Sequence, residues 1–98
     1  MNNSGDQQEI RIDIDDKTAA GTYSNLAIIS HTENEVVMDF IFIHPPKGRV
    51  NSRIVMSPAH AKKFFKALKE NVEIYEKNFG GIKDIPEPPK MGIDFSKN

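Results

Sequence analysis

The sequence has no cysteine, almost no net charge and no long hydrophobic run, and each absence excludes a class of function. Without cysteine, the chain cannot form a disulfide, a thiolate metal site or a thiol nucleophile. The 13 basic and 14 acidic residues give a formal net charge of −1, which provides no overall attraction to nucleic acid or to an anionic membrane. The first residues, MNNSGDQQE, lack the apolar stretch of a signal peptide, and no apolar run is long enough to span a bilayer. We therefore expect a cytoplasmic protein that has no cofactor and no membrane partner.

The length of 98 residues is enough for one small domain. A domain of this size buries only part of its surface, so association with another copy is a common way to gain stability. We expect a disordered N-terminus at residues 1–9, a sheet-plus-helix domain at 10–82 and a proline-rich tail at 83–98. Three apolar residues of the tail could dock on the domain or on a partner: Met91, Ile93 and Phe95.

Four segments have the pattern of β-strands: residues 10–15, 23–30, 36–43 and about 50–56. In the first, Ile10, Ile12 and Ile14 alternate strictly with polar residues, as in a half-buried strand. The intervening stretch DDKTAAGT is predicted to be a loop, and HTENE and HPPKGR are predicted turns. Successive antiparallel neighbours are the simplest topology for such strands.

A long amphipathic helix is predicted to begin at Ser57 and to stop at Gly80. Its apolar residues follow spacings of three and four: Ala61, Phe65, Leu68, Val72, Tyr75 and Phe79. Ser57 is placed to cap the helix, Pro58 suits the first helical position, and His60 could accept a hydrogen bond from the Ser57 backbone. The predicted fold class is α+β, with a single antiparallel sheet of about four strands, one long helix and an extended C-terminal tail.

The segment 36–43 is apolar on both of its faces. Alternate residues from Val36 to Phe42 form one face, and the other carries Val37, Ile41 and Ile43, interrupted only by Asp39. One helix can cover only one face of a sheet. We therefore predict that Val37, Ile41 and Ile43 contact another copy of the chain, in a dimer or a higher homo-oligomer. The alternatives are cover by the chain's own tail or a dedicated surface for a protein or peptide partner.

Two arrangements of histidine invite a catalytic or metal-binding interpretation. Ser57 and His60 are three residues apart, but a capping hydroxyl is directed at the backbone, and the glycine-rich turn of a serine nucleophile is missing. His31, His44 and His60 fall at a turn, a strand end and a helix start, without the paired spacing of a metal site. We predict that the protein is not an enzyme and holds no metal.

A cluster of basic residues suggests a second class of function. It lies around the last turn of the sheet and the start of the helix and includes Arg49, Arg53, Lys62 and Lys66. Such a patch could touch phosphates, although glutamates share the helix and no aromatic residue stands among the lysines to stack on bases. A nucleic-acid-associated protein is therefore the less favoured alternative.

Several stretches resemble those of one family: YSN at 23–25, ISHT at 29–32, DFIF at 39–42, and SRIVMSPAHAK at 52–62 followed by YE and FG up to Gly80. These segments are similar to a small prokaryotic family of unknown function, DUF3467. The resemblance covers roughly residues 22–82 and implies a single antiparallel sheet with one helix. It implies no activity, substrate or catalytic residue.

The predicted plan also resembles that of SecB-type export chaperones. These proteins assemble through their sheets and helices and bind unfolded chains in apolar grooves, so this likeness of architecture implies a chaperone-like role. The prediction for function is a non-enzymatic, homo-oligomeric, protein-binding module.

Overall fold

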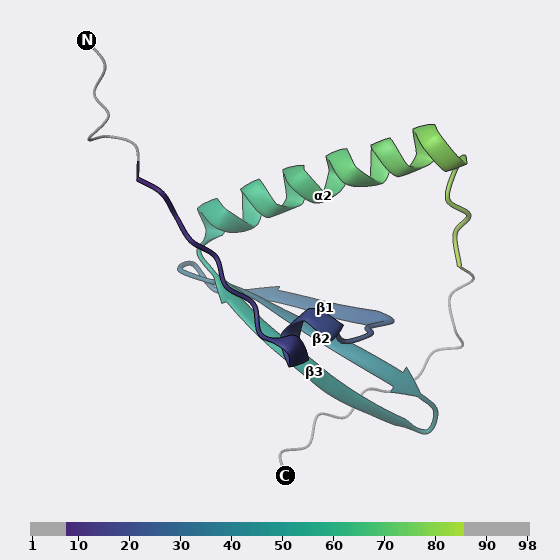
Figure 1. Cartoon of the computed structure of the whole chain (residues 1–98). Coiled ribbons are helices and arrows are strands. Elements are labelled where there is room, and N and C mark those ends of the chain that lie inside the picture. Colours follow the sequence, from purple (N-terminus) through teal and green to yellow (C-terminus); the bar gives the residue numbers. More distant parts are fainter. Residues whose placement is uncertain (1–7, 86–98) are drawn as a thin grey trace. The chain divides into compact units, whose positions relative to one another are not determined.

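The computed structural model describes residues 8–85. The chain divides into two compact units, Met1–Pro58 and Ala59–Asn98. The first unit contains the sheet, and the second contains nearly all of the long helix (Figure 1). No helix within the described residues is long and apolar enough to cross a membrane.

The sheet has three antiparallel strands in the order β1-β2-β3: β1 at Leu26–His31, β2 at Val36–His44 and β3 at Lys47–Met56. The strands predicted at 23–30, 36–43 and 50–56 are thus confirmed, although the first begins only at Leu26. The turn predicted at HTENE is confirmed, whereas only Pro45 and Pro46 of the turn predicted at HPPKGR lie outside the strands. β3 begins earlier than predicted because the chain resumes pairing directly after Pro45 and Pro46, with Lys47 opposite His44. The α+β class is confirmed, with three strands in the sheet.

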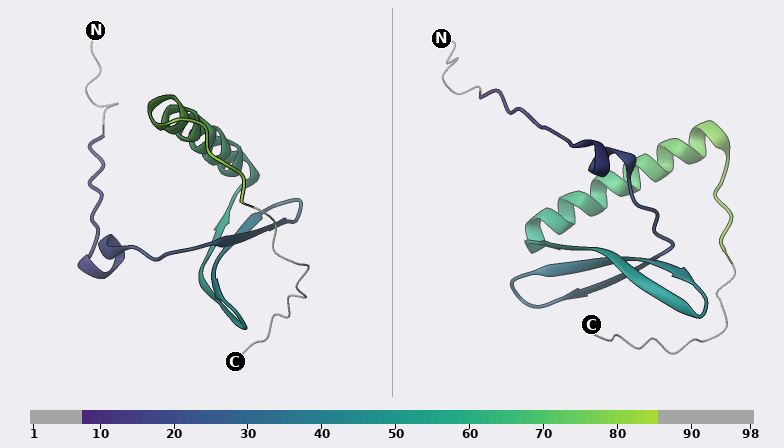
Figure 2. Two further views of the ribbon diagram at one scale, coloured as in Figure 1. Left: turned by 90° about the vertical axis from the view of Figure 1, so that its right-hand side faces the viewer. Right: turned by 60° about the horizontal axis from the view of Figure 1, so that its bottom comes forward.

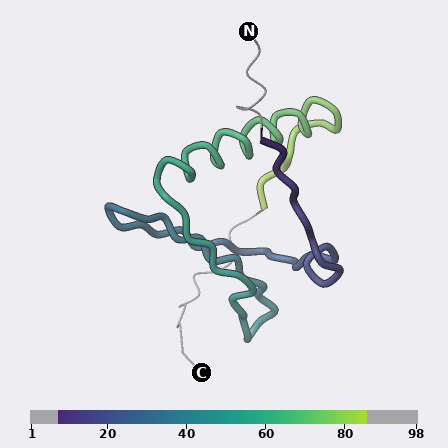
Figure 3. The backbone as a smooth tube through the Cα atoms, turned by 60° about the vertical axis from the view of Figure 1, so that its left-hand side comes forward, coloured from purple at the N-terminus to yellow at the C-terminus, as the bar shows by residue number. Residues whose placement is uncertain are grey.

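The prediction of a fourth strand at residues 10–15 is wrong. Among the described residues this segment belongs to no sheet, and Ile10, Ile12 and Ile14 are 80%, 87% and 66% exposed. An alternating pattern determines which way side chains point, but a strand also needs the backbone of a neighbour. Figure 3 shows this segment as a stretch of backbone that leads into the first helix.

That first helix, α1 at Asp16–Ala20, lies where the sequence predicts a loop. Asp15 is its N-cap, and the Asp15 carboxylate accepts a hydrogen bond of 2.8 Å from the Thr18 backbone N–H. The helix ends at Gly21, whose φ of 83° favours glycine. A single short turn carries too little periodic pattern to be recognised in the sequence.

The second helix, α2 at Pro58–Phe79, confirms the predicted helix. Ser57 directly precedes it and His60 is its third residue, as the predicted cap requires. After Phe79 the chain turns at Gly80, which has a φ of 97° and donates a 2.8 Å hydrogen bond to the Glu76 carbonyl. The tail residues Met91, Ile93 and Phe95 lie outside the described residues.

Candidate interaction surface

β2 is the central strand of the sheet, whose ribbon Figure 2 shows from two sides. The strand register shows that β1 and β3 extend the two apolar faces of β2 across the sheet. Residues directly opposite each other on antiparallel strands share a face. One face, which we call the Val37 face, carries Leu26, Ile28, Val37, Ile41, Ile43, Val50 and Val55. The other, the Met38 face, carries Ala27, Ile29, Val36, Met38, Phe40, Phe42, Ile54 and Met56.

Both faces expose large apolar side chains. On the Met38 face Ile29 is 62% exposed and Ile54 42%, and on the Val37 face Val55 is 49% exposed. Within the described residues the buried apolar core consists of only Met38 and Ile41. The sheet unit therefore leaves apolar surface on both sides.

The three residues predicted as a partner surface do share the Val37 face, but they differ in accessibility. Ile41 is only 5% exposed, and Val37 and Ile43 are half-buried. The more accessible apolar residues of this face are Val50 and Val55 of β3. Sequence reasoning missed them because the face they share with β2 depends on the strand register.

A β-bulge at Asn51 sets that register. Ile41 lies opposite Val50, but the next residue, Phe40, lies opposite Ser52, so Asn51 is an extra residue on β3. Beyond the bulge, Arg53 lies directly opposite Asp39. Without it, regular pairing would place Ser52 opposite Asp39.

Asp39 and Arg53 form an ion pair on the Val37 face. The Arg53 guanidinium donates from Nε to one carboxylate oxygen at 2.7 Å and from Nη2 to the other at 2.8 Å. The Asp39 side chain is 7% exposed, whereas that of Arg53 is 62% exposed. The hydrogen bonds from Arg53 lower the pKa of Asp39, and they raise the pKa of Arg53 in turn.

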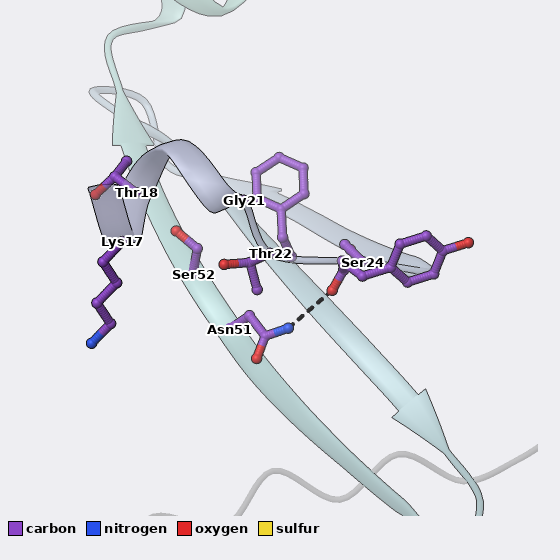
Figure 4. Close-up of a pocket in the computed structure, with 9 residues that line it drawn as sticks. Lys17, Thr18, Gly21, Thr22, Ser24, Asn51 and Ser52 are labelled. Carbon is purple, nitrogen blue, oxygen red and sulfur yellow. Dashed lines mark hydrogen bonds between the residues drawn. The ribbon is translucent and has the colours of Figure 1, made fainter. Parts of the chain in front are cut away.

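The residues before β1 are fixed to the rest of the sheet through polar side chains. The Asn25 side chain accepts from the Ile43 N–H at 2.8 Å and donates to the Ile43 carbonyl at 2.9 Å, in the manner of a paired strand residue. Ser24 donates through its hydroxyl to the Ile41 carbonyl at 3.1 Å. Asn51, at the bulge, donates to the Tyr23 carbonyl at 3.0 Å (Figure 4). The YSN segment thus positions β1.

An open pocket lies between α1, the following loop and β3 (Figure 4). Its lining residues are Lys17, Thr18, Gly21, Thr22, Tyr23, Ser24, Phe40, Asn51 and Ser52. No carboxylate or histidine lines it, and its ionisable side chains are those of Lys17 and Tyr23. Among residues 8–85, no group of three or more histidine or carboxylate side chains is arranged to hold a metal ion.

The predicted basic cluster is divided between elements. Arg49 lies opposite Phe42 on the Met38 face, whereas Arg53 lies opposite Asp39 on the Val37 face. Lys62 and Lys66 are one turn apart on α2, in the second unit. The two arginines therefore do not share one face of the sheet, and Arg53 is already bound to a carboxylate.

The sequence profile of one family, described as Protein of unknown function (DUF3467), matches residues 1–84. Neither a curated protein nor a solved structure matches the chain. The match spans the segments on which the family resemblance rests, whereas the likeness to SecB-type chaperones is one of architecture alone and stays a prediction.

Proposed function

The chain belongs to the DUF3467 family, and on that premise we propose that it is a non-enzymatic module that associates with further copies of itself through its sheet. The observation that supports the proposal is the apolar character of both faces of one three-stranded sheet. A single helix can cover one face and leaves the other for a partner.

Energetics favour a partner over exposure to water. Complete burial of a fully exposed aliphatic side chain contributes about 1.5–3 kcal/mol. Ile54 and Val55 are 42% and 49% exposed, so each would gain roughly half of that on association. A second copy presents the same apolar face, which makes a self-complementary, twofold interface the simplest solution. An apolar segment of another protein would fit the same face, and this is the chaperone-like form of the proposal.

The basic residues give less support to a nucleic-acid partner. Arg49 and Arg53 point to opposite faces, and Arg53 is engaged by Asp39. A phosphate contact would have to compete with that ion pair. We therefore retain protein association as the proposed function.

Two adjacent residues of β3 provide a matched test. Ile54 and Val55 have similar exposure, 42% and 49%, and lie on opposite faces. We expect the wild-type chain to be oligomeric in the micromolar range by size exclusion with light scattering. We expect at least one of Ile54→Glu and Val55→Glu to dissociate the oligomer, because an interface through the sheet would bury at least one of its two apolar faces.

Two results would count against the proposal. A wild-type chain that is strictly monomeric throughout the micromolar range would remove it. It would equally fail if both variants kept the wild-type oligomeric state while remaining folded by circular dichroism, since neither face would then be an interface.

A further inference from the structure

The segment Ile10–Asp15 has the properties of a strand without a neighbour. Arg11 donates from Nε to Asp13 at 3.2 Å, so these two side chains lie on one side, as in an extended backbone. The three isoleucines that alternate with the polar residues are at least 66% exposed. Because these side chains are not buried within their own chain, their burial requires a surface on another molecule.

The outer edge of β3 is an open place for such a strand. β3 pairs with β2 on one side only, and no described residue makes a backbone hydrogen bond to its other side. This edge spans ten residues and is exposed along nearly its whole length. It is also basic, with Lys47 and Arg49 in no ion pair among residues 8–85. The opposite edge, at β1, is shorter and carries no acidic or basic residue apart from His31.

We propose that Ile10–Asp15 of one copy adds as an antiparallel strand to the outer edge of β3 in a second copy. The same segment of the second copy adds to β3 of the first. The inference rests on the proposed self-association and adds to it a contact at the edge of the sheet. It gives the isoleucines a neighbour and supplies the free backbone groups of β3 with hydrogen-bond partners.

Charge complementarity selects β3 and indicates a register. With Asp13 opposite Arg49, Asp15 falls opposite Lys47, so both aspartates of the arm lie beside the two cations of β3. Arg11, which pairs with Asp13 within the arm, falls opposite Asn51. Ile12 and Ile14 then lie on the Val37 face, opposite Val50 and Gly48. The acidic arm would gain no such pairing along β1.

A second copy is the favoured recipient because the arm's own chain holds it apart. Asp15 caps α1 through the Thr18 N–H, which fixes the direction in which the preceding residues leave the helix. The 87% exposure of Ile12 shows that the arm makes no strand contact within its own chain. Exchange between two copies gives each arm a strand to pair with and produces a closed dimer with twofold symmetry.

Reversing one charge at a time tests the exchange in the full-length chain. We expect Asp13→Lys alone, and Arg49→Asp alone, each to weaken the dimer about tenfold or more, since each replaces two attractive pairs in the dimer by repulsive ones. An equimolar mixture of the two variants should recover the wild-type affinity, because each arm then meets an edge of opposite charge. The measurement is analytical ultracentrifugation over a concentration series, with Glu33→Lys, in the turn between β1 and β2, as the control for net charge.

The outcomes separate this inference from the proposed function. If the wild type is dimeric and neither single reversal weakens it more than Glu33→Lys does, arm exchange is wrong and self-association stands. Arm exchange is also wrong if the single variants weaken the dimer and mixing restores nothing, since the arm would then act within its own chain. A monomeric wild type would remove both proposals.

Discussion

The ion pair between Asp39 and Arg53 is asymmetric, and this predicts unequal effects of removing either partner. Asp39 is nearly buried, whereas Arg53 is largely exposed. Arg53→Met leaves a carboxylate without water or a cation, while Asp39→Asn leaves a guanidinium that water can still solvate. We expect Arg53→Met to lower the free energy of unfolding more than Asp39→Asn does at neutral pH, as measured by urea denaturation.

The pH dependence of the same variants provides the control. Because Arg53 lowers the pKa of Asp39 in the folded state, its stabilisation is fully present above the ordinary aspartate pKa of 3.8 and is lost as the pH falls through the folded value. The difference between wild type and Arg53→Met should therefore shrink below about pH 4. Equal stability of the two substituted chains at neutral pH, or a difference that grows in acid, would contradict this account.

At the scale of secondary-structure elements, the long helix could be predicted from its local pattern. The sheet could be predicted only in part, because it also depends on pairing between strands. The stripe from Ala61 to Phe79 and the stop at Gly80 are encoded within a few residues of where they act. The segment 10–15 has an equally regular pattern, but its state depends on a neighbouring strand that its own residues do not specify.

The bulge at Asn51 explains why the candidate surface could be only partly predicted. The two apolar faces of β2 follow from alternation alone. The identity of the residues opposite depends on one extra residue in β3, which exchanges Ser52 for Arg53 opposite Asp39. The sequence alone shows that Asp39 interrupts an apolar face. Without the strand register it does not show that Arg53 neutralises the Asp39 carboxylate.

The end of α2 offers a matched pair of glycines. Gly80 has a φ of 97°, whereas Gly81 has no positive φ, and a Cβ at either position would meet nothing within 4 Å. We expect Gly80→Ala to lower the free energy of unfolding by about 1 kcal/mol through backbone strain alone. Gly81→Ala should instead raise it, by up to about 1 kcal/mol, because alanine restricts the unfolded chain without straining the folded one. Urea denaturation followed by circular dichroism compares them, and equal effects would argue against a strained helix end.

At the scale of the whole molecule, stability should depend on protein concentration. Met38 and Ile41 are the only buried apolar residues among those described, and a core this small gives a single copy little to offset the conformational entropy lost on folding. If the exposed faces and the arm are buried between copies, association stabilises the folded state by mass action. The midpoint of thermal unfolding should then rise by several degrees for each tenfold increase in chain concentration. Asp13→Lys should flatten this dependence, whereas Glu33→Lys should leave it unchanged. A midpoint that stays constant across the micromolar range would mean that each copy is stable alone, in conflict with a sheet that needs its partner.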